Sequence, residues 1–479
     1  MTSILIILLL FRIGVTIGYW KLFEKAGVEG WKSLIPLYSE YWLIKIIGKP
    51  VWWVLYLFIP ILNIFTFYVL LFDLLRCFGK NSLMSQFLII FIGPVYIPYI
   101  GFKKEVKYLG KLDELEEEKK SALSEWTEAI AFAVVAATLI RWLIMEAYTI
   151  PTPSMENSLL VGDFLFVSKF HYGTRTPKTP LQVPLTHQKI WFTEIPSYVE
   201  WIQLPQYRLP GISKVKRNDV VVFNIPPRDL NEGKDYPVDL KTNYIKRCVG
   251  VPGDVLKVVG KQLVVNNEPQ PNPEDMEFSY LVTSKDEINE RNLDKLGIDP
   301  DDYNYLGRPE EGKAVYQMYL PADKVEELKT LPYIISVGPD YRMNSGSDPR
   351  IFPRSKYSRW NADDYGPITI PARGMTIDIN DSTLAFYGNT IQLYDHNENV
   401  VVGDSTLTID GQEVKQYTFK QNYYFMMGDN RHNSLDSRFW GFVPEDHIVG
   451  KAFFVWLSLD KYAGFFDRIR WRRFFKMIE

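Results

Sequence analysis

Cysteine and histidine are scarce in this sequence. Its 479 residues include two cysteines, Cys77 and Cys248, and five scattered histidines. Cys77 lies in an apolar stretch and Cys248 in the middle of the more polar part of the chain, so no disulfide between them is expected. No two histidines have the spacing of metal ligands on a helix. These shortages exclude a disulfide framework and a cysteine-based metal site.

An excess of charge of one sign is also missing. Lysine and arginine number 54, aspartate and glutamate number 57, and the formal net charge is -3. Domains that bind nucleic acid usually present a strongly basic face. The composition therefore argues against a nucleic-acid partner.

Apolar residues, by contrast, are abundant and unevenly distributed. Hydrophobic residues make up 47% of the chain and aromatic residues 15%, and this excess is concentrated in the first 150 residues. The chain is also longer than a single compact domain usually is. These features predict a membrane region followed by a separate globular domain.

Four apolar stretches approach the roughly 20 residues that a helix needs to cross a bilayer. They cover residues 2–20, 51–75, 85–102 and 129–150. The third is the weakest candidate, because Pro94 and Pro98 remove backbone donors. The first lacks a basic start and a small-residue cleavage site, so we interpret it as a retained anchor.

Lysine-rich loops set the expected orientation of these stretches. Lysines gather in residues 21–49 and again in residues 103–120, and short loops of this kind remain on the cytoplasmic side. The sequence therefore predicts a membrane region with about three spans and a charged cytoplasmic segment over residues 1–125. A transmembrane anchor is predicted over residues 126–150, with everything after it outside the cytoplasm.

The pattern changes after Val161 to short β-branched and aromatic runs separated by Gly, Pro, Asn and Asp. This pattern predicts an all-β domain over residues 151–460. A stretch rich in Pro, Asp, Asn and Tyr, at about 271–364, is interpreted as an insertion or cap. Residues 461–479 form a basic and aromatic tail that suits a membrane surface, with a solvated amphipathic helix as the alternative.

Three short motifs contain residues with chemical potential. Ser154 stands in PTPSM, where prolines favour extended backbone, although most such serines belong to ordinary loops. Lys246 stands in the apolar run YIKRCVGVPGD, where a surface lysine is the simpler interpretation. A free lysine has a pKa near 10.4, so a lysine that acts as a base must be desolvated. The third motif, GDNRHNSLDSRFWGFVP, places a polar network directly before a core run.

Together with RNDVVVFNIP, these motifs resemble the successive signature boxes of type I signal peptidases, in the same order. The resemblance covers about half of the chain. It implies a membrane-bound serine endopeptidase with Ser154 as nucleophile and Lys246 as general base, which removes signal peptides from exported preproteins by acyl transfer. It implies no metal and no cofactor. The expected partners are signal peptides, the lipid bilayer and the secretion translocon, at the periplasmic side of the bacterial inner (cytoplasmic) membrane.

The resemblance also implies roles for residues around the dyad. The Thr152 hydroxyl is expected to join the Ser154 backbone N–H in an oxyanion hole, and Ser434 to orient the lysine amine. Supporting residues are Asp436, Arg438, Asp429 and Arg247. Residues expected to line the substrate pockets are Tyr148, Ile150, Met155, Leu159, Tyr244 and Ile245. Pro153 departs from the family, in which a small flexible residue is commoner.

The predicted fold class is mainly β: a multi-span α-helical membrane region followed by an all-β signal-peptidase-like catalytic domain with an inserted cap. Three alternatives remain open. His432 could serve as the base, although we interpret it as a solvent-facing loop residue. The chain could be a non-enzymatic, membrane-anchored β domain, such as a chaperone or assembly factor. It could also be a serine-lysine protease with other membrane or exported substrates.

Overall fold

The computed structural model describes residues 2–58, 62–115, 122–201, 203–310, 312–341, 346–464 and 467–478. The chain divides into two compact units, Met1–Leu139 and Ile140–Glu479. Each unit has its own hydrophobic core. The two are therefore described separately.

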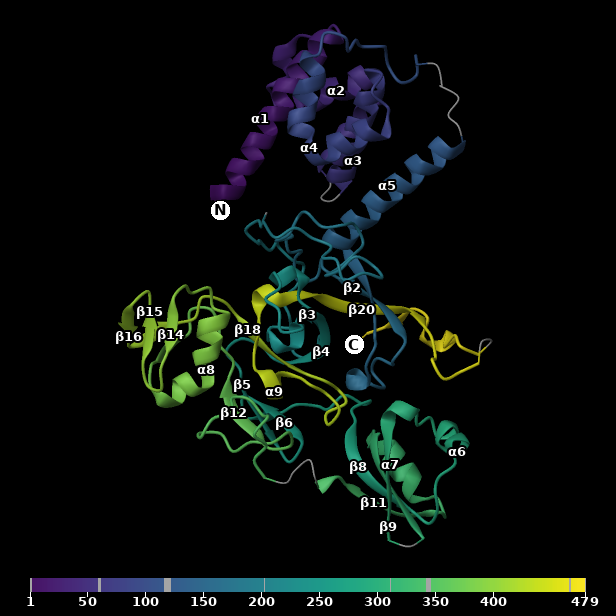
Figure 1. The fold of residues 1–479 in the computed structure, drawn as a ribbon, viewed down its shortest axis with the longest axis vertical. Helices are drawn as coiled ribbons and strands as arrows, with labels where there is room; N and C mark the ends of the chain where they lie inside the picture. Colours follow the sequence, from purple (N-terminus) through teal and green to yellow (C-terminus); the bar gives the residue numbers. More distant parts are fainter. Residues whose placement is uncertain are drawn as a thin grey trace. The chain divides into compact units, whose positions relative to one another are not determined.

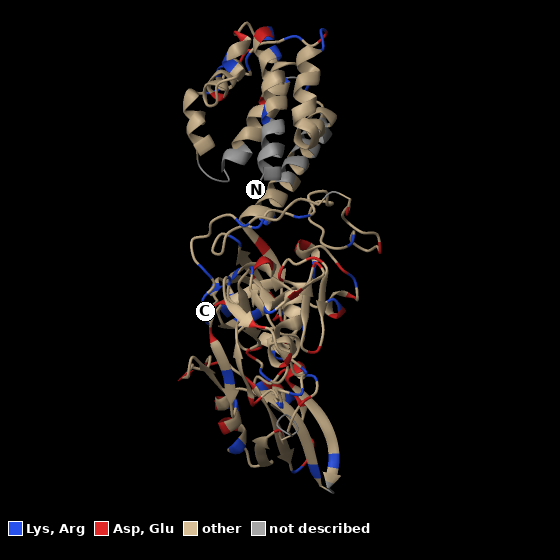
Figure 2. Cartoon of the chain, turned by 90° about the vertical axis from the view of Figure 1, so that its left-hand side faces the viewer, with Lys and Arg blue, Asp and Glu red and all other residues tan. Residues whose placement is uncertain are grey.

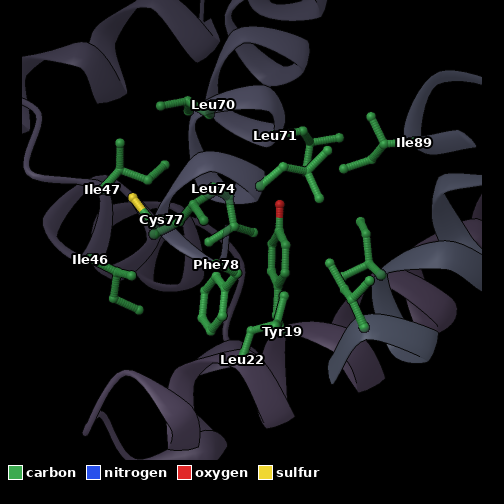
Figure 3. Close-up of a cluster of buried hydrophobic side chains, with 14 of the residues drawn as sticks. Tyr19, Leu22, Ile46, Ile47, Leu70, Leu71, Leu74, Cys77, Phe78 and Ile89 are labelled. Carbon is green, nitrogen blue, oxygen red and sulfur yellow. The ribbon is translucent and has the colours of Figure 1, made fainter. Parts of the chain in front are cut away.

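The first unit is helical (Figure 1). Its helices are α1 (Thr2–Lys25), α2 (Tyr38–Ile47), α3 (Leu62–Cys77), α4 (Leu83–Phe102) and the first part of α5 (Ala122–Leu143), with 3-10 turns at Gly30–Ser33 and Val51–Phe58. Figure 3 shows aliphatic side chains from α2, α3 and α4 gathered around Tyr19 of α1. Its charged residues lie mostly at the loop ends of the helices (Figure 2). The burial of these apolar faces against one another is what holds the unit together.

Helices α1 and α4 pack closely because α1 presents glycine to its neighbour. A Cβ at Gly14 would lie 2.5 Å from the Pro94 carbonyl oxygen, and a Cβ at Gly18 would lie 2.5 Å from Ile97 Cγ2. Small residues one turn apart allow helix backbones to approach in this way. Inside α4, Ile92 has non-helical dihedral angles, φ -131 and ψ 30, so the helix is kinked two residues before Pro94. A kink next to a proline has the usual steric cause.

Among the described residues, one helix is long and apolar enough to cross a membrane, Met84–Phe102. It coincides with the stretch that contains the two prolines. The predicted span over residues 51–75 differs, because a 3-10 turn occupies Val51–Phe58 and α3 begins at Leu62. At 1.5 Å per residue, the 16 residues of α3 rise only about 24 Å, less than the roughly 30 Å of a bilayer core. The multi-span arrangement therefore stays a prediction.

The helix in this region ends earlier in the sequence than the anchor predicted over residues 126–150. Helix α5 stops at Leu143, and Met145–Thr149 forms strand β1, which pairs with β2 (Asp163–Ser168). Pro151 follows directly and keeps the preceding backbone extended. The hydrophobic run thus contains both a helix and the first strand of the second unit.

The second unit is built on one large antiparallel sheet in the order β1-β2-β20-β3-β4-β18-β19, with β21 paired to β20 (Figure 1). The further strands of this sheet are β3 (Val220–Asn224), β4 (Asn243–Gly250), β18 (Tyr423–Met427), β19 (Val443–Pro444), β20 (Ile448–Ser458) and β21 (Lys476–Met477). Strand β3 is buried along its whole length. A strand covered on both faces reads as a continuous apolar run, as VVVFN does.

Smaller sheets flank the large one. One has the order β12-β5-β6-β7, with β5 (Val255–Val259), β6 (Gln262–Val265), β7 (Glu268–Pro269) and β12 (Tyr365–Thr369). A second lobe contains β13 (Thr376–Asp378), α8 (Asp381–Leu393), β14 (Val400–Val402), β15 (Leu407–Ile409), β16 (Gln412–Val414) and β17 (Gln416–Thr418). The unit is therefore mostly β, and the all-β prediction is corrected by α8 and three shorter helices.

The predicted insertion contains a folded subdomain, here called the cap (residues 278–339). Its sheet has the order β11-β8-β10-β9, and α6 and α7 pack with it (Figure 1). The elements are β8 (Phe278–Ser284), α6 (Glu290–Lys295), β9 (Tyr303–Glu310), β10 (Lys313–Leu320), α7 (Ala322–Lys329) and β11 (Ile334–Pro339). Its core includes Val282, Leu293 and Met318. The apolar residues of this core show no regular spacing in the sequence, because they come from positions far apart in the chain.

The basic tail is not an amphipathic helix over its described residues. It forms a 3-10 turn at Trp471–Arg473 and strand β21, which pairs with β20. The Arg473 Nε donates to Asp163 Oδ1 at 2.9 Å, and Arg470 donates to the Val161 carbonyl. Because Asp163 is fully buried, its need for a counter-charge holds this part of the tail on the sheet.

Candidate active site

Ser154 lies on a short 3-10 turn, Pro153–Met155, between β1 and β2. Pro153 occupies the first position of the turn, where a missing N–H costs no hydrogen bond. The Ser154 side chain is buried, and Lys246 Nζ donates to its Oγ at 2.6 Å. Two residues separated by 92 positions in the chain are therefore in direct contact.

Lys246 reaches Ser154 from β4, where it pairs with Val221 of β3. Burial lowers the pKa of its amine to about 8, and the carboxylates of Asp436 and Asp429 partly oppose that shift. The Ile245 carbonyl also accepts a hydrogen bond from Nζ, at 2.9 Å. Because a base must be unprotonated to act, an amine with this pKa is available at mildly alkaline pH.

The loop that follows β18 supplies a buried ion pair. Arg438 Nε donates to Asp436 Oδ1 at 2.9 Å and Arg438 Nη2 donates to Oδ2 at 2.8 Å. Burial by itself would raise the pKa of the Asp436 carboxyl, but the Arg438 guanidinium reverses this and holds it below its usual value. Asp436 also accepts the Gly428 N–H at 3.1 Å. The pair thus fixes the loop beside the dyad.

A second buried pair connects the loop to the nucleophile turn. Arg247 Nη2 donates to Asp429 Oδ2 at 2.7 Å, and the Ser158 hydroxyl donates to the same oxygen at 2.7 Å. Next to it, the Asn430 N–H donates to the Ser154 carbonyl at 3.3 Å. The four predicted supporting residues thus form two ion pairs around Ser154 and Lys246.

Ser434 is brought close to Ser154, but its predicted contact with the lysine is not seen. Among the described residues, the hydrogen-bond partners of the Lys246 amine are Ser154 and the Ile245 carbonyl. Sequence reasoning missed Gly428. A Cβ there would lie 2.3 Å from Ser434 Oγ and 2.4 Å from the Ser154 carbonyl oxygen. Its position at the head of the polar motif was the available signal, because only glycine permits so close an approach.

Thr152 precedes the nucleophile turn in extended backbone, with φ -133 and ψ 151. Its side chain is exposed, two residues before Ser154. It therefore lies at the open side of the turn. An oxyanion hole formed with the Ser154 N–H stays a prediction.

The expected pocket residues separate into two groups. Ile150, Met155 and Leu159 belong to one buried cluster, and Met155 and Leu159 have no exposed surface. Tyr148 and Ile245 are partly buried against that cluster, while Tyr244 packs in the neighbouring one. The surfaces left to contact a ligand directly are therefore those of the three partly buried side chains, with the others supporting them from below.

His432 is not solvent-facing, contrary to the expectation from sequence. Its side chain is buried, Nδ1 accepts the Ser279 N–H at 3.0 Å, and Nε2 lies 2.7 Å from Asp363 Oδ1. The acceptor role of Nδ1 leaves the proton on Nε2. Burial lowers the pKa of this imidazole. Because both partners lie outside the dyad, the described contacts of His432 are structural.

Two family models match the chain. The model described as "Signal peptidase, peptidase S26" matches residues 123–310 and 367–457. It includes Ser154, Lys246 and the polar loop, and it omits residues 311–366, part of the predicted insertion. A family of unknown function, DUF5684, matches residues 31–111 in the helical unit.

The chain is also similar to curated proteins. Signal peptidase I of Haemophilus influenzae is 26% identical over 391 residues, which cover 77% of this chain and 80% of the relative. Signal peptidase I of Buchnera aphidicola subsp. Acyrthosiphon pisum is 25% identical over 328 residues, or 68% and 73% of the two chains. Signal peptidase I of Pseudomonas fluorescens is 26% identical over 351 residues, or 71% and 74%.

Proposed function

Because this chain belongs to the signal peptidase family, peptidase S26, and is an enzyme, we propose that it removes signal peptides from exported preproteins through Ser154, with Lys246 as general base. The observation that carries the proposal is the 2.6 Å contact between Ser154 Oγ and Lys246 Nζ. A nucleophile held against a desolvated base is the arrangement that acyl transfer by serine requires. The low pKa of the amine supports it.

The proposed reaction is acyl transfer in two steps. Neutral Lys246 takes the hydroxyl proton as Ser154 Oγ attacks the carbonyl carbon, and the protonated amine then donates to the leaving nitrogen of the mature protein. Water, deprotonated by Lys246, hydrolyses the ester and releases the signal peptide. The oxyanion would rest on the Ser154 N–H and Thr152, and one such donor is typically worth about 3–4 kcal/mol.

The first test is processing of a preprotein by the purified full chain. We expect cleavage after a site with small residues at the first and third positions before the cut. Phe at either position should lower kcat/KM at least tenfold, because Tyr148, Tyr244 and Ile245 leave little room. Peptides that differ only at these two positions provide the comparison. Equal cleavage of bulky and small sites would favour a serine-lysine protease with other substrates.

The rate should depend on pH through the lysine. With a pKa of about 8, Lys246 is mostly protonated and inactive below that pH, so kcat/KM should fall roughly tenfold per pH unit from pH 7 downward. Above pH 8 the rate should level off. A peptide without titratable side chains isolates the effect. A limb that levels off near pH 6.5 would instead indicate a histidine base.

We place the catalytic unit on the periplasmic side of the inner membrane, in contact with lipid and with the secretion translocon. Both native cysteines are buried, so added cysteines can be labelled selectively. In intact cells, an impermeant thiol reagent should label an Arg291→Cys chain and spare a Lys107→Cys chain. Both positions are exposed. The opposite labelling pattern would rule out this orientation.

A further inference from the structure

A cavity of about 490 Å³ lies where the nucleophile turn meets the cap. Its lining includes Asn157, three residues after Ser154, and carboxylates from several segments of the chain. The lining carboxylates are Glu274, Asp275, Glu277, Asp302 and Asp323. One lysine, Lys324, also lines it, but its ammonium pairs with Glu327 at 2.9 Å. The ionisable groups that line this acidic cavity are therefore mostly carboxyl groups.

Two of these carboxylates are buried with an oxygen left without a partner. Asn157 donates to Glu277 Oε1 at 2.6 Å, and the Asp299 N–H donates to Asp302 Oδ2 at 3.2 Å. Glu277 Oε2 and Asp302 Oδ1 accept no aligned hydrogen bond from any described residue. Asn430 lies near enough to lower the pKa of Glu277, but its amide is not aligned for a hydrogen bond. When such a buried carboxyl is ionised, its unpartnered oxygen needs a donor or a cation.

No described basic side chain forms an ion pair with Glu277 or Asp302. Glu277 faces the carboxyls of Asp302, Glu156 and Asp275, and burial together with these neighbours raises its pKa to about 10. Asp302 has its pKa raised to about 7 by burial and then by Asp299 and Asp301, against a small opposing effect of Lys461. The pKa of Glu156 is also raised, and its carboxyl faces Asp302, Asp299 and Arg470.

Both neighbouring cations form other ion pairs, although Arg470 also lies 3.7 Å from the Asp299 carboxylate. Lys461 forms an ion pair with Asp301, and Arg470 bonds the Val161 carbonyl and pairs with Asp460 at 3.2 Å. A cationic group that enters the cavity would therefore favour the ionised form of these carboxyls, which would release a proton when it binds. Its attraction would be strong because the site is poorly solvated.

The arrangement favours an organic cation over a metal ion. Among the described residues, no three His, Cys, Asp or Glu side chains converge closely enough to hold a metal ion. The cavity volume is that of a pocket for a side chain or small molecule. Lysine and arginine carry their charge at the end of a flexible stem that reaches into such a space.

A short series of backbone hydrogen bonds connects the cavity wall to Ser154. The Glu277 N–H donates to the Asp429 carbonyl at 3.0 Å, and the Arg431 N–H donates to the Glu277 carbonyl at 2.9 Å. Between these residues, Asn430 bonds the Ser154 carbonyl. Glu277, in the wall of the cavity, is thus hydrogen-bonded to the loop that packs on the nucleophile turn.

We propose that this acidic cavity binds a lysine or arginine side chain of the substrate polypeptide, a few residues from the scissile bond. The proposal rests on the proposed function, since it assigns a subsite to that reaction. Because an extended chain advances about 3.3 Å per residue, only a few positions of a bound peptide can reach the cavity. The subsite would select among preproteins by charge, whereas the pockets at the cut select by size.

The test uses the purified full chain and a series of peptides with small residues before the cut. Each peptide carries Arg at one of the positions flanking the small-residue site, and its partner carries Gln there. At one or two positions we expect KM to be about tenfold lower for Arg than for Gln, with kcat little changed, as for an interaction present in ground and transition states alike. Glu277→Gln and Asp302→Asn should remove this preference and leave turnover of the Gln peptides unchanged.

A matched control is Glu326→Gln, an exposed carboxylate on α7 that should leave the preference intact. The preference should also grow between pH 6 and 8, because the ionised fraction of Asp302 rises with pH and a cation binds the ionised form. A purely structural role for these carboxyls would not produce that dependence. Normal turnover of Gln peptides by each variant shows that it has folded.

Two outcomes would overturn the proposal. They are equal KM for Arg and Gln at every position, and a preference that survives both substitutions. Binding of fluorescent Arg and Gln peptides to the Ser154→Ala chain gives a readout without cleavage. If no peptide is cleaved but Arg-selective binding persists, the proposed function fails and the cavity assignment stands.

Discussion

Replacement of either Ser154 or Lys246 by alanine is expected to lower kcat/KM by roughly four to six orders of magnitude, as in other nucleophile–base pairs. Ser154→Ala removes the attacking oxygen. Lys246→Ala leaves the hydroxyl without the amine that lies 2.6 Å from it. The double variant should be hardly slower than either single one, because the two groups act as a unit. The measurement is cleavage of a preprotein-like peptide under single-turnover conditions.

Lys451→Ala is the matched control for the lysine. Lys451 lies on β20 of the same sheet and pairs with Asp219 rather than with Ser154, so its loss should leave the rate within a few-fold. Unchanged far-ultraviolet circular dichroism would show that the inactive chains are folded. Near-normal cleavage by the Lys246→Ala chain would contradict the dyad.

Arg438→Met is expected to lower the free energy of unfolding by about 3–5 kcal/mol, the usual cost of leaving a buried charge without its partner. Asp436 is fully buried, so without the guanidinium it loses its counter-charge and two hydrogen bonds. The loop beside Lys246 should loosen, and activity should fall as well. Chemical denaturation of the purified chain, followed by tryptophan fluorescence, measures the change.

The chain contains a matched control for this substitution. Arg350 pairs with Asp348 in the same Asp-x-Arg spacing and also through two nitrogens, but its side chain is 74% exposed. Arg350→Met should therefore cost less than about 1 kcal/mol. Equal losses in the two variants would show that burial of the ion pair does not determine its contribution to stability.

The motifs PTPSM and YIKRCVGVPGD, through their resemblance to signal peptidase boxes, pointed to Ser154 and Lys246 in the sequence. The structure places these two side chains in contact, and their roles in the reaction stay a prediction. The pairing of Arg438 with Asp436 followed from the same kind of motif. Residues that act through backbone groups, such as the Ile245 carbonyl that accepts from the lysine, left no signal in the side-chain pattern.

The errors have a common origin. Hydropathy marked residues 129–150 as one span, yet its last residues pair with β2, which lies beyond the nucleophile turn. The exposure of His432 was misjudged, and the helix offered as an alternative for the tail is not formed, because their partners, Asp363 and Asp163, are distant in sequence. The spacing of apolar residues indicates which face of a single helix or strand is apolar. The burial of a residue depends instead on the elements that pack against it.

The amino-acid sequence by itself determined the hydroxyl and the amine proposed to react, through motifs that resemble those of signal peptidases, and that a β domain follows an apolar region. These are properties of side-chain type and of short-range order. Only the tertiary structure decided that Lys246 is buried and that its pKa falls to about 8, because desolvation comes from strands and loops far away in the chain. It alone also assembled the acidic cavity from Asn157, the segment that precedes the cap and the cap itself.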